Sequence, residues 1–332
     1  MNNTFCCGAT LRTFSLLLVF LLAGLACRAA EIWVSPAGSD AGPGTREEPL
    51  ATLAMALRKA RELRRLADPS ADDGIRIILR GGVYRLYEPV LVRPEDSGTA
   101  GSPTTVEAAE GEFPVISGGV EIKGWKKAAG RIPGLPQEAQ GAIWEAGLPG
   151  MGAPLRFRQL WVNDRKAERA SSLHDGTLHR ILSVDNQKEE MWIPVPEAGP
   201  EYTEGLEFII HQWWAIANLR VKSLEISGDK AKLTFHQPES RIEFEHPWPA
   251  PFIDSEKKYN GNSAFYFANS IQLLNRPGEW YADYRTGKVY YWPRGGEDLG
   301  KARVVAPRLE TLLRVQGSPD DPVEHLVFKG IG

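Results

Sequence analysis

The chain has 332 residues, of which 42% are hydrophobic and 24% charged, and its formal net charge at pH 7 is −3. These values are those of an ordinary globular protein, and the length allows two domains. A mildly acidic chain without a block of like charge lacks the basic surface that nucleic-acid binding requires, so nucleic acid is excluded as a partner.

Residues 1–30 are predicted to be a secretory signal peptide. Arg12 supplies a weakly positive start, residues 14–25 are a continuous apolar run, and Ala29 and Ala30 offer small side chains near which cleavage is expected. The apolar run is too short to span a bilayer comfortably, which disfavours an uncleaved anchor. We therefore expect a secreted or periplasmic bacterial protein with no membrane span in the mature chain.

All the cysteines lie in this leader, at Cys6, Cys7 and Cys27. A lipoprotein signal at Cys27 is an alternative, although residues 24–26 fit that pattern poorly. The mature chain would contain no cysteine, which indicates an exported protein stabilised by its core and its strand hydrogen bonds instead of disulfides. A thiol nucleophile is excluded on the same ground.

The next segment, residues 31–57, predicts a strand, a turn-rich loop and a helix. Residues 32–34 are apolar, and Thr52 can accept a hydrogen bond from the first turn of a helix. The residues that recur at helical spacing, and so form one apolar stripe, are Leu50, Leu53, Leu57, Ala60 and Leu63.

Short strands without intervening helices follow, separated by corners rich in Gly and Pro. We expect them at residues 75–79, 90–92, 104–108 and 115–117. The pattern suits solenoid coils or a sandwich, and coils are favoured because the helix precedes the strands and does not alternate with them. Residues 31–119 are assigned to these first coils.

From residue 120 the strands become longer and more alternating, and seven tryptophans occur before residue 249. The expected strands are residues 155–162, 206–214, 221–226 and 231–236, with turns at 163–164 and 227–229. The clearest hairpin pairs residues 278–283 with 288–293, and Gly287 supplies the positive φ of its turn. We predict an antiparallel β domain, residues 120–302, inserted into the coils.

Residues 303–332 are predicted to resume the coils, with short strands at 303–306, 312–315 and 323–328. The sequence stops at Gly332 without a polar capping segment, and the terminal repeats of a solenoid need a polar outer face. We therefore expect the chain to be the N-terminal piece of a longer protein.

Several segments in this order resemble one family: VSPAGSDAGPGTREEPLATL, GGVYRL, EPVLV, RQLWVNDRKAERA and NRPGEWYADYRTGKVYYWP. Together they resemble glycoside hydrolase family 141 and its secreted β-helix relatives over nearly all of residues 31–332. The resemblance implies a mainly β fold, a right-handed parallel β-helix whose N-terminal end is capped by the first strand and helix. It also implies the family's insertion domain, and removal of sugars such as fucose or cleavage of xylan. The catalytic acids of such enzymes lie on later coils, which we expect beyond Gly332, so no catalytic residue is assigned.

The candidate substrate-binding residues are His211, Trp213, Trp214 and Trp248. Aromatic faces stack on the apolar faces of sugars, and a nearby His or Gln can bind hydroxyls. The alternative for residues 211–214 is a buried tryptophan pair in the domain core, which the high average burial of Trp favours. Trp248 lies between two prolines, so a loop position is expected, where it either contacts sugar or packs locally.

Glycoside hydrolysis requires two carboxyl groups at a defined separation. Asp254, Glu256, Glu279 and Asp283 fit a cleft by their surroundings, but solvated loop and hairpin charges are the favoured interpretation. No metal is expected, because the sequence lacks EF-hand spacing and a third ligand for His174 and His179. No other cofactor is expected, because phosphate-loop and dinucleotide motifs are lacking.

The sequence thus favours the N-terminal part of a carbohydrate-active enzyme, most consistent with a glycoside hydrolase acting on complex plant or algal polysaccharides. Whether this chain is itself an enzyme stays open. One alternative is a polysaccharide lyase on the same scaffold. Another is a non-catalytic β-helix that binds glycans at the cell surface, because a β-helix can host several functions.

Overall fold

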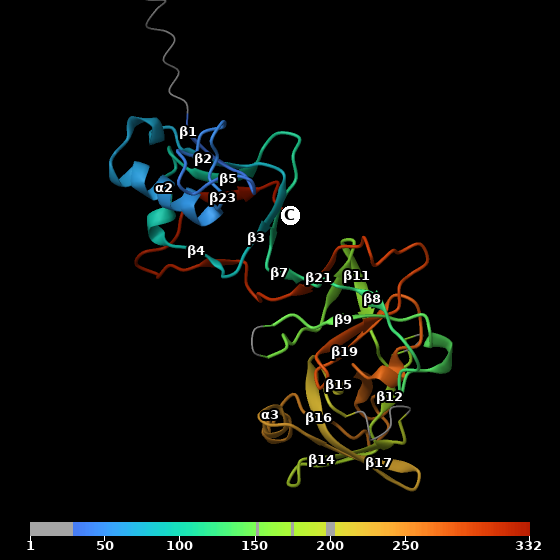
Figure 1. Ribbon diagram of the computed structural model, residues 1–332. Coiled ribbons are helices and arrows are strands. Elements are labelled where there is room, and N and C mark those ends of the chain that lie inside the picture. The colour runs from blue at the N-terminus through green and yellow to red at the C-terminus, as the bar shows by residue number, and fades with distance from the viewer. Residues whose placement is uncertain (1–28, 151–152, 174–175, 197–202) are drawn as a thin grey trace, which may run out of the picture. The chain divides into compact units, whose positions relative to one another are not determined.

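The computed structural model describes residues 29–150, 153–173, 176–196 and 203–332. All of the predicted signal peptide except Ala29 and Ala30 lies outside these residues. The described chain is mainly β and contains two α-helices (Figure 1). In that part of the chain, neither helix is long and apolar enough to cross a membrane.

The chain forms two compact units. The first ends at Gly118 and resumes with Leu309–Gly332, and the second comprises Gly119–Arg308. The chain leaves and re-enters the first unit at one point, because the Leu309 amide donates a hydrogen bond of 3.0 Å to the Gly118 carbonyl.

Helix α2 (Leu53–Arg65) begins where the sequence predicts. The Thr52 hydroxyl accepts a hydrogen bond of 3.2 Å from the Met55 amide. Asp40 fixes this end from the preceding loop, because its carboxylate accepts from the Ala51 and Thr52 amides, each at 2.9 Å. The buried stripe of the helix consists of Leu53, Ala56, Leu57 and Ala60.

The strands of the first unit form three parallel sheets. One sheet has the order β1-β2-β5-β23, and β23 joins it from the far end of the sequence (Figure 1). Two smaller ladders pair β3 with β6 and β4 with β22. The bounds are β1 (Ala30–Val34), β2 (Ile75–Leu79), β3 (Gly82–Arg85), β4 (Val90–Val92), β5 (Thr104–Ala108), β6 (Pro114–Ser117), β22 (Leu313–Val315) and β23 (Leu326–Lys329).

Successive strands of the first unit therefore enter different ladders. Strands β2, β3 and β4 come first, and β5, β6 and β22 then lie beside them in the same order. Their inward side chains share one apolar core with α2. The predicted strands at residues 90–92 and 104–108 are confirmed at those bounds.

The second unit contains two sheets. The eight-stranded sheet has the order β7-β21-β10-β11-β19-β20-β9-β8, and its pairings are antiparallel except that of β11 with β19. The bounds are β7 (Gly119–Glu121), β8 (Lys126–Lys127), β9 (Trp144–Gly147), β10 (Leu160–Val162), β11 (Arg165–Arg169), β19 (Glu279–Asp283), β20 (Lys288–Tyr291) and β21 (Val304–Pro307).

The seven-stranded sheet is antiparallel throughout, with the order β12-β18-β15-β16-β17-β14-β13. Helix α3 (Glu239–Glu245) contacts β16 and β17. The bounds are β12 (His179–Arg180), β13 (Ser183–Asp185), β14 (Glu190–Pro194), β15 (Glu207–His211), β16 (Ile216–Ser227), β17 (Lys230–Phe235) and β18 (Ala264–Ala268).

The predicted hairpin at residues 278–293 is confirmed as β19–β20. Tyr281 and Tyr290 lie opposite each other with ring centroids 6.0 Å apart and nearly parallel planes, and Gly287 has φ +67°. Both faces of this hairpin are covered, since Tyr281 and Tyr290 join one core while Trp280 and Tyr291 join the other.

Two sequence predictions need correction. Residues 303–306 do not resume the coils: β21 pairs antiparallel with β10 and β7 inside the second unit, and Val304 and Ala306 enter that unit's core. A short apolar run does not specify its hydrogen-bonding partner, which is why the sequence misplaced this boundary. The predicted strands at 155–162 and 206–214 are also shorter, because their ladders span only Leu160–Val162 and Glu207–His211.

Candidate functional site

Five aromatic side chains gather on the surface of the second unit, and we call them the aromatic cluster: Trp213, Trp214, Trp248, Phe252 and Tyr259. Trp213 and Trp214 occupy the turn between β15 and β16, which is closed by a hydrogen bond of 2.9 Å from the Gln212 amide to the Ala215 carbonyl. Trp248 follows α3, and the other two residues precede β18.

Trp213 is the centre of the aromatic cluster. Its ring stacks on Phe252 at 4.7 Å, meets the edge of Tyr259 at 4.5 Å and lies 5.5 Å from Trp248, as measured between ring centroids. Trp214 adds an edge-on contact with Trp248 at 4.8 Å. These mutual contacts fix the rings, so they form one surface and not separate flexible side chains.

The residues of the aromatic cluster remain partly open to solvent, and Phe252, which is half-buried, is the least exposed of them. Trp213 is 37% exposed, Trp214 66%, Trp248 49% and Tyr259 54%. The favoured expectation of a buried tryptophan pair is therefore wrong. The β15 ladder ends at His211, so the two tryptophans lie past the last strand pair and away from the core. An exposed patch of aromatic faces is the type of surface on which sugar rings stack.

His211 and Gln212 are engaged differently from the tryptophans. His211 is half-buried and its ring centroid lies 6.0 Å from that of Tyr266. The side-chain amide of Gln212 donates a hydrogen bond to the carboxylate of Glu243 on α3, so this amide nitrogen is already engaged within the protein. Burial of Glu243 outweighs this hydrogen bond and raises the pKa of that carboxyl to about 7. The structure thus brings together the three tryptophan candidates, while His211 lies by Tyr266.

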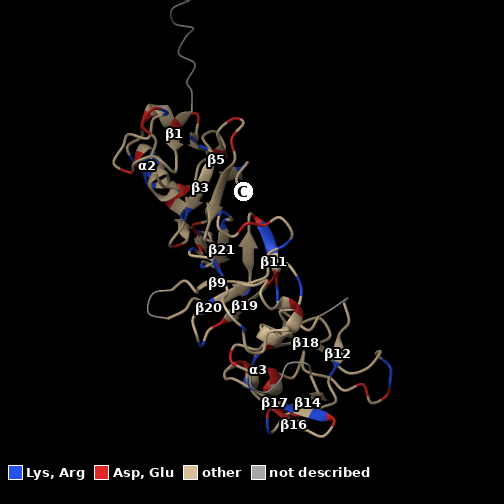
Figure 2. Ribbon diagram, turned by 45° about the vertical axis from the view of Figure 1, so that its right-hand side comes forward, with Lys and Arg blue, Asp and Glu red and all other residues tan. Residues whose placement is uncertain are grey.

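The second feature is a concave surface of about 610 Å³ beside β11 and β15, which we call the cationic groove. Its charged lining residues are Arg158, Lys166, Glu168, Arg169, Glu207 and Arg276. Figure 2 shows basic residues on β11, and this strand supplies three of the charged lining residues: Lys166, Glu168 and Arg169. The sequence did not indicate this groove, because its residues come from separate strands.

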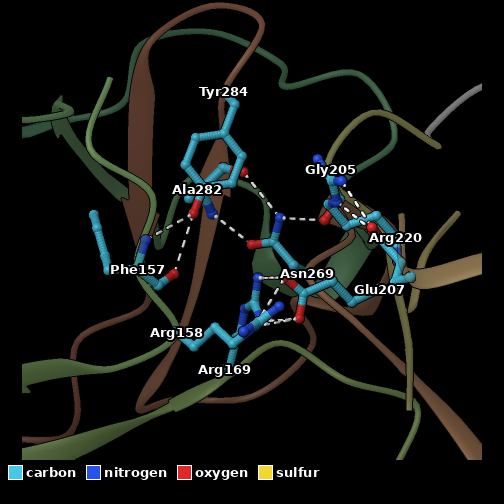
Figure 3. Close-up of polar contacts among 10 residues, drawn as sticks. Phe157, Arg158, Arg169, Gly205, Glu207, Arg220, Asn269, Ala282 and Tyr284 are labelled. Carbon is cyan, nitrogen blue, oxygen red and sulfur yellow. Dashed lines mark hydrogen bonds and ion pairs between the residues drawn. The ribbon is translucent and has the colours of Figure 1, made fainter. Parts of the chain in front are cut away.

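Glu207 organises one side of the cationic groove (Figure 3). Its carboxylate accepts from Arg169 Nη1 at 2.7 Å and Nη2 at 3.2 Å, and from Arg158 Nε at 3.0 and 3.2 Å. Burial opposes ionisation of Glu207, but the hydrogen bonds and charges of Arg169 and Arg158 outweigh it and hold the pKa of the carboxyl below its usual value. The two guanidinium groups are therefore held by one ionised carboxylate.

Asn269 and Tyr284 fix the neighbouring backbone (Figure 3). The buried Asn269 amide accepts from the Ala282 amide at 3.0 Å and donates to the carbonyls of Gly205 and Ala282 at 3.0 and 3.1 Å. The Tyr284 hydroxyl donates to the Phe157 carbonyl at 3.1 Å. These contacts tie the segments before Arg158 and Glu207 to strand β19 and the turn that follows it.

The acidic residues that the sequence suggested for a cleft each serve a local structural role. Asp254 accepts from the backbone amides of residues 258, 259 and 261, and Asp283 from those of residues 285 and 286. Glu256 pairs with Lys258 on the surface. Glu279 is fully buried and accepts from the side chain and amide of Arg276, so it is not the solvated charge expected.

A larger concave surface of about 1020 Å³ lies in the first unit, beside the start of α2 and strand β4. It is wide and its lining includes Arg61, Arg93 and Arg314. Its size alone does not make it the stronger candidate for binding sugar, because the stacked exposed rings lie in the second unit. In the described part of the chain, no group of three or more His, Cys, Asp or Glu residues is placed to hold a metal ion.

Comparisons with known proteins agree with the resemblance seen in the sequence. Residues 141–294 match the family model of the GH141 insertion domain. A solved structure described as a glycoside hydrolase is 46% identical, with a TM-score of 0.81, and the match covers 91% of this chain and 50% of that one. The chain therefore spans half the length of this structural neighbour.

Two curated proteins match over shorter stretches. Pectate lyase PEL9 of Emericella nidulans is 37% identical over 90 residues, which is 27% of this chain and 19% of that protein. The uncharacterized protein YwoF of Bacillus subtilis is 39% identical over 87 residues, 26% of this chain and 15% of that protein. Two likenesses therefore cover most of the chain: residues 141–294 resemble the insertion domain of glycoside hydrolase family 141, and 91% of the chain resembles a solved glycoside hydrolase.

Proposed function

We propose that this chain, which carries a GH141-like insertion domain, is the N-terminal part of a secreted glycoside hydrolase that acts on complex plant or algal polysaccharides. The observation that carries the proposal is the 46% identity and TM-score of 0.81 with a solved glycoside hydrolase. Fucosidase-like or xylanase-like specificity and export through the leader are parts of the proposal.

The first unit, in this proposal, forms the first coils of a right-handed parallel β-helix. The support is the cyclic order of its strands, in which β5, β6 and β22 lie in register beside β2, β3 and β4. Helix α2 packs into the core that these strands build, and in this proposal it caps the end of the β-helix. The second unit is then an insertion in the connection between β6 and β22, and it brings the aromatic cluster to the glycan.

The catalytic carboxyl groups, in this proposal, lie outside residues 29–332. Hydrolysis needs two such groups about 5 to 9.5 Å apart, one of them free to protonate the leaving oxygen. In this chain, Asp254, Asp283 and Glu279 hold turns, loops and ion pairs instead. The contribution of this chain is a scaffold and a surface on which sugar rings stack.

Assays of the complete reading frame and of the 332-residue chain test the proposal. Both would be incubated with fucosylated glycans, xylan and pectins, and released sugars would be quantified. We expect hydrolysis by the complete protein, and glycan retention without turnover by the 332-residue chain. Full activity of the 332-residue chain would overturn the assignment of the catalytic groups. Retention without turnover by the complete protein would point to a glycan-binding protein of the cell surface.

A polysaccharide lyase is the second candidate, because a 90-residue stretch is 37% identical to a pectate lyase. A lyase removes a proton next to a uronate and leaves an unsaturated product. Ultraviolet-absorbing products from the complete protein, lost on chelation of calcium, would replace the hydrolase proposal with this one.

A further inference from the structure

We propose that the cationic groove binds an anionic substituent, a carboxylate or a sulfate, of the glycan. This inference rests on the proposed function and adds a substrate class to it: an acidic polysaccharide. It is carried by an excess of positive charge in a concave surface, by donors in that surface that the protein leaves unused, and by their rigid support.

The floor of the cationic groove is the outer face of the seven-stranded sheet. Opposed residues of an antiparallel ladder project to the same side, and alternate residues of one strand project to opposite sides. Ile209 lies opposite both Asn218 and Tyr266. The neighbouring positions Phe208 and Ile210 point the other way, into the core. The groove residues of this sheet therefore share one face, which the core does not cover.

The cationic groove carries more positive than negative charge. Four lining residues are basic and two are acidic: Arg158, Lys166, Arg169 and Arg276 against Glu168 and Glu207. Glu207 is shared by Arg158 and Arg169, and Glu168 lies 3.5 Å from Arg276. Arg276 is also paired with the buried Glu279. Within the part of the chain described, Lys166 has no ion pair, so its charge is available to a ligand.

Arg158 also has unused donors. Only its Nε contacts Glu207, and within the described ranges neither Nη nitrogen makes a hydrogen bond. Its side chain is 56% exposed, whereas that of Arg169 is 12% exposed. A guanidinium held at one edge and open at the other is suited to bind a carboxylate or sulfate.

Neutral donors complete the cationic groove. Burial raises the pKa of Tyr266, so its hydroxyl stays protonated and can donate a hydrogen bond. Asn218 offers an amide on the same face. A neutral sugar would use these groups but gain nothing from Lys166 or the open edge of Arg158. The groove therefore discriminates by charge.

The test compares one polymer in two charge states. Polygalacturonate and its fully methyl-esterified form share a backbone, and sulfated and unsulfated galactan form a second pair. Binding of the 332-residue chain would be measured by affinity electrophoresis and calorimetry at low and high salt. The test variant is Arg158→Gln/Lys166→Gln. The matched control is Lys127→Gln/Arg131→Gln, which removes the same charges from exposed positions elsewhere in the second unit.

We expect the wild-type chain to bind at least one anionic polymer about tenfold more tightly than its neutral partner, with this preference weakened by salt. The polymer pair that shows the preference identifies carboxylate or sulfate. The test variant should lose the preference and the control should keep it. If the double variant folds poorly, Lys166→Gln alone replaces it and should give a partial loss of the preference.

Equal binding of charged and neutral polymers by the wild-type chain, or equal loss in test and control variants, would overturn the groove as an anion site. Trp214→Ala separates this from the proposed function, because it should weaken binding of charged and neutral polymers alike. Failure of the wild-type chain to bind any of these polymers would overturn the groove as an anion site, whereas the hydrolase proposal is decided by the activity of the complete protein.

Discussion

Two hairpins of the second unit contain similar aromatic residues and use them in opposite ways. The hairpin β15–β16 carries Trp213 and Trp214 in its turn, where they are 37% and 66% exposed. The hairpin β19–β20 carries Trp280 and Tyr291 within its ladder, where both are fully buried. Position relative to the end of the ladder, and not residue type, decides between a surface for ligands and a core.

The β19–β20 hairpin lies between two cores, so both sets of alternating side chains are covered. The β15–β16 hairpin has one face in the core, with Phe208 and Ile210, and another face along the cationic groove, where Glu207 and Ile209 are also buried; its exposed aromatic residues lie in the turn beyond the ladder. The first arrangement makes aromatic residues essential for stability. The turn of the β15–β16 hairpin leaves Trp213 and Trp214 free for binding. The contrast between the two hairpins can be tested by mutation.

The largest effect is expected from Trp280→Ala. Its ring stacks on Phe157 with centroids 5.1 Å apart, so truncation leaves a cavity and should cost about 3–5 kcal/mol of unfolding free energy. Urea unfolding measures this, with Trp214→Ala as the exposed counterpart, which should lose less than about 1 kcal/mol. Similar losses in the two variants would contradict the contrast between the hairpins.

The next effect is expected from Glu207→Gln at the start of β15. Removing the charge leaves Arg169 largely buried without its partner, which should cost about 3 kcal/mol at pH 7. Because the folded pKa of Glu207 lies below its unfolded value, this stabilisation is present above the ordinary glutamate pKa of 4.5 and is lost as pH falls through the folded pKa. Urea unfolding of both proteins across pH 7 to 3 should therefore show the difference shrinking.

In contrast to the preceding variants, Glu243→Gln, at the residue that accepts from Gln212, should raise the free energy of unfolding. The carboxyl has a folded pKa of about 7 against the ordinary glutamate pKa of 4.5, so ionisation of the unfolded state lowers stability as pH rises from 4.5 to 7. A glutamine avoids this and still accepts from Gln212, so the variant should be about 3 kcal/mol more stable at pH 8 and nearly unchanged at pH 4. Thermal melts at both pH values check this, with the exposed Glu245→Gln as control. A variant no more stable at pH 8 than at pH 4, relative to wild type, would refute it.

Truncation of the exposed tryptophans should change the stability of the protein least and its glycan binding most. Trp214→Ala and Trp248→Ala each remove a partly exposed ring, so melting temperatures should change little, while glycan affinity falls about tenfold. Calorimetric titration with the polymer that the wild-type chain binds measures this. Phe113→Ala, which truncates an 84% exposed ring in the first unit, is the control and should leave binding unchanged.

The sequence predicted those features that depend on nearby residues. Thr52 caps α2 through a residue three positions away, and Gly287 shapes a turn within its own hairpin. The strand at residues 303–306 was misplaced because its partners, β7 and β10, lie far away in the sequence.

The candidate site shows the same limit. Trp213, Trp214 and Trp248 were proposed from local composition, and their exposure could not be read because it depends on where the β15 ladder ends. Phe252 and Tyr259 were missed, since nothing near them indicates that their rings meet Trp213. The cationic groove needs the registers of β11, β15 and β18, which the sequence pattern does not specify.

The junction of Gly118 and Leu309 has a consequence for biosynthesis. When a ribosome makes this chain, β4 and β5 emerge early, but their partners β22 and β23 appear only after the whole second unit. Until then, the waiting edges of β4 and β5 can template contacts with other nascent chains. Prompt folding of the second unit, which would bring Leu309 back to Gly118, then protects the growing chain from aggregation.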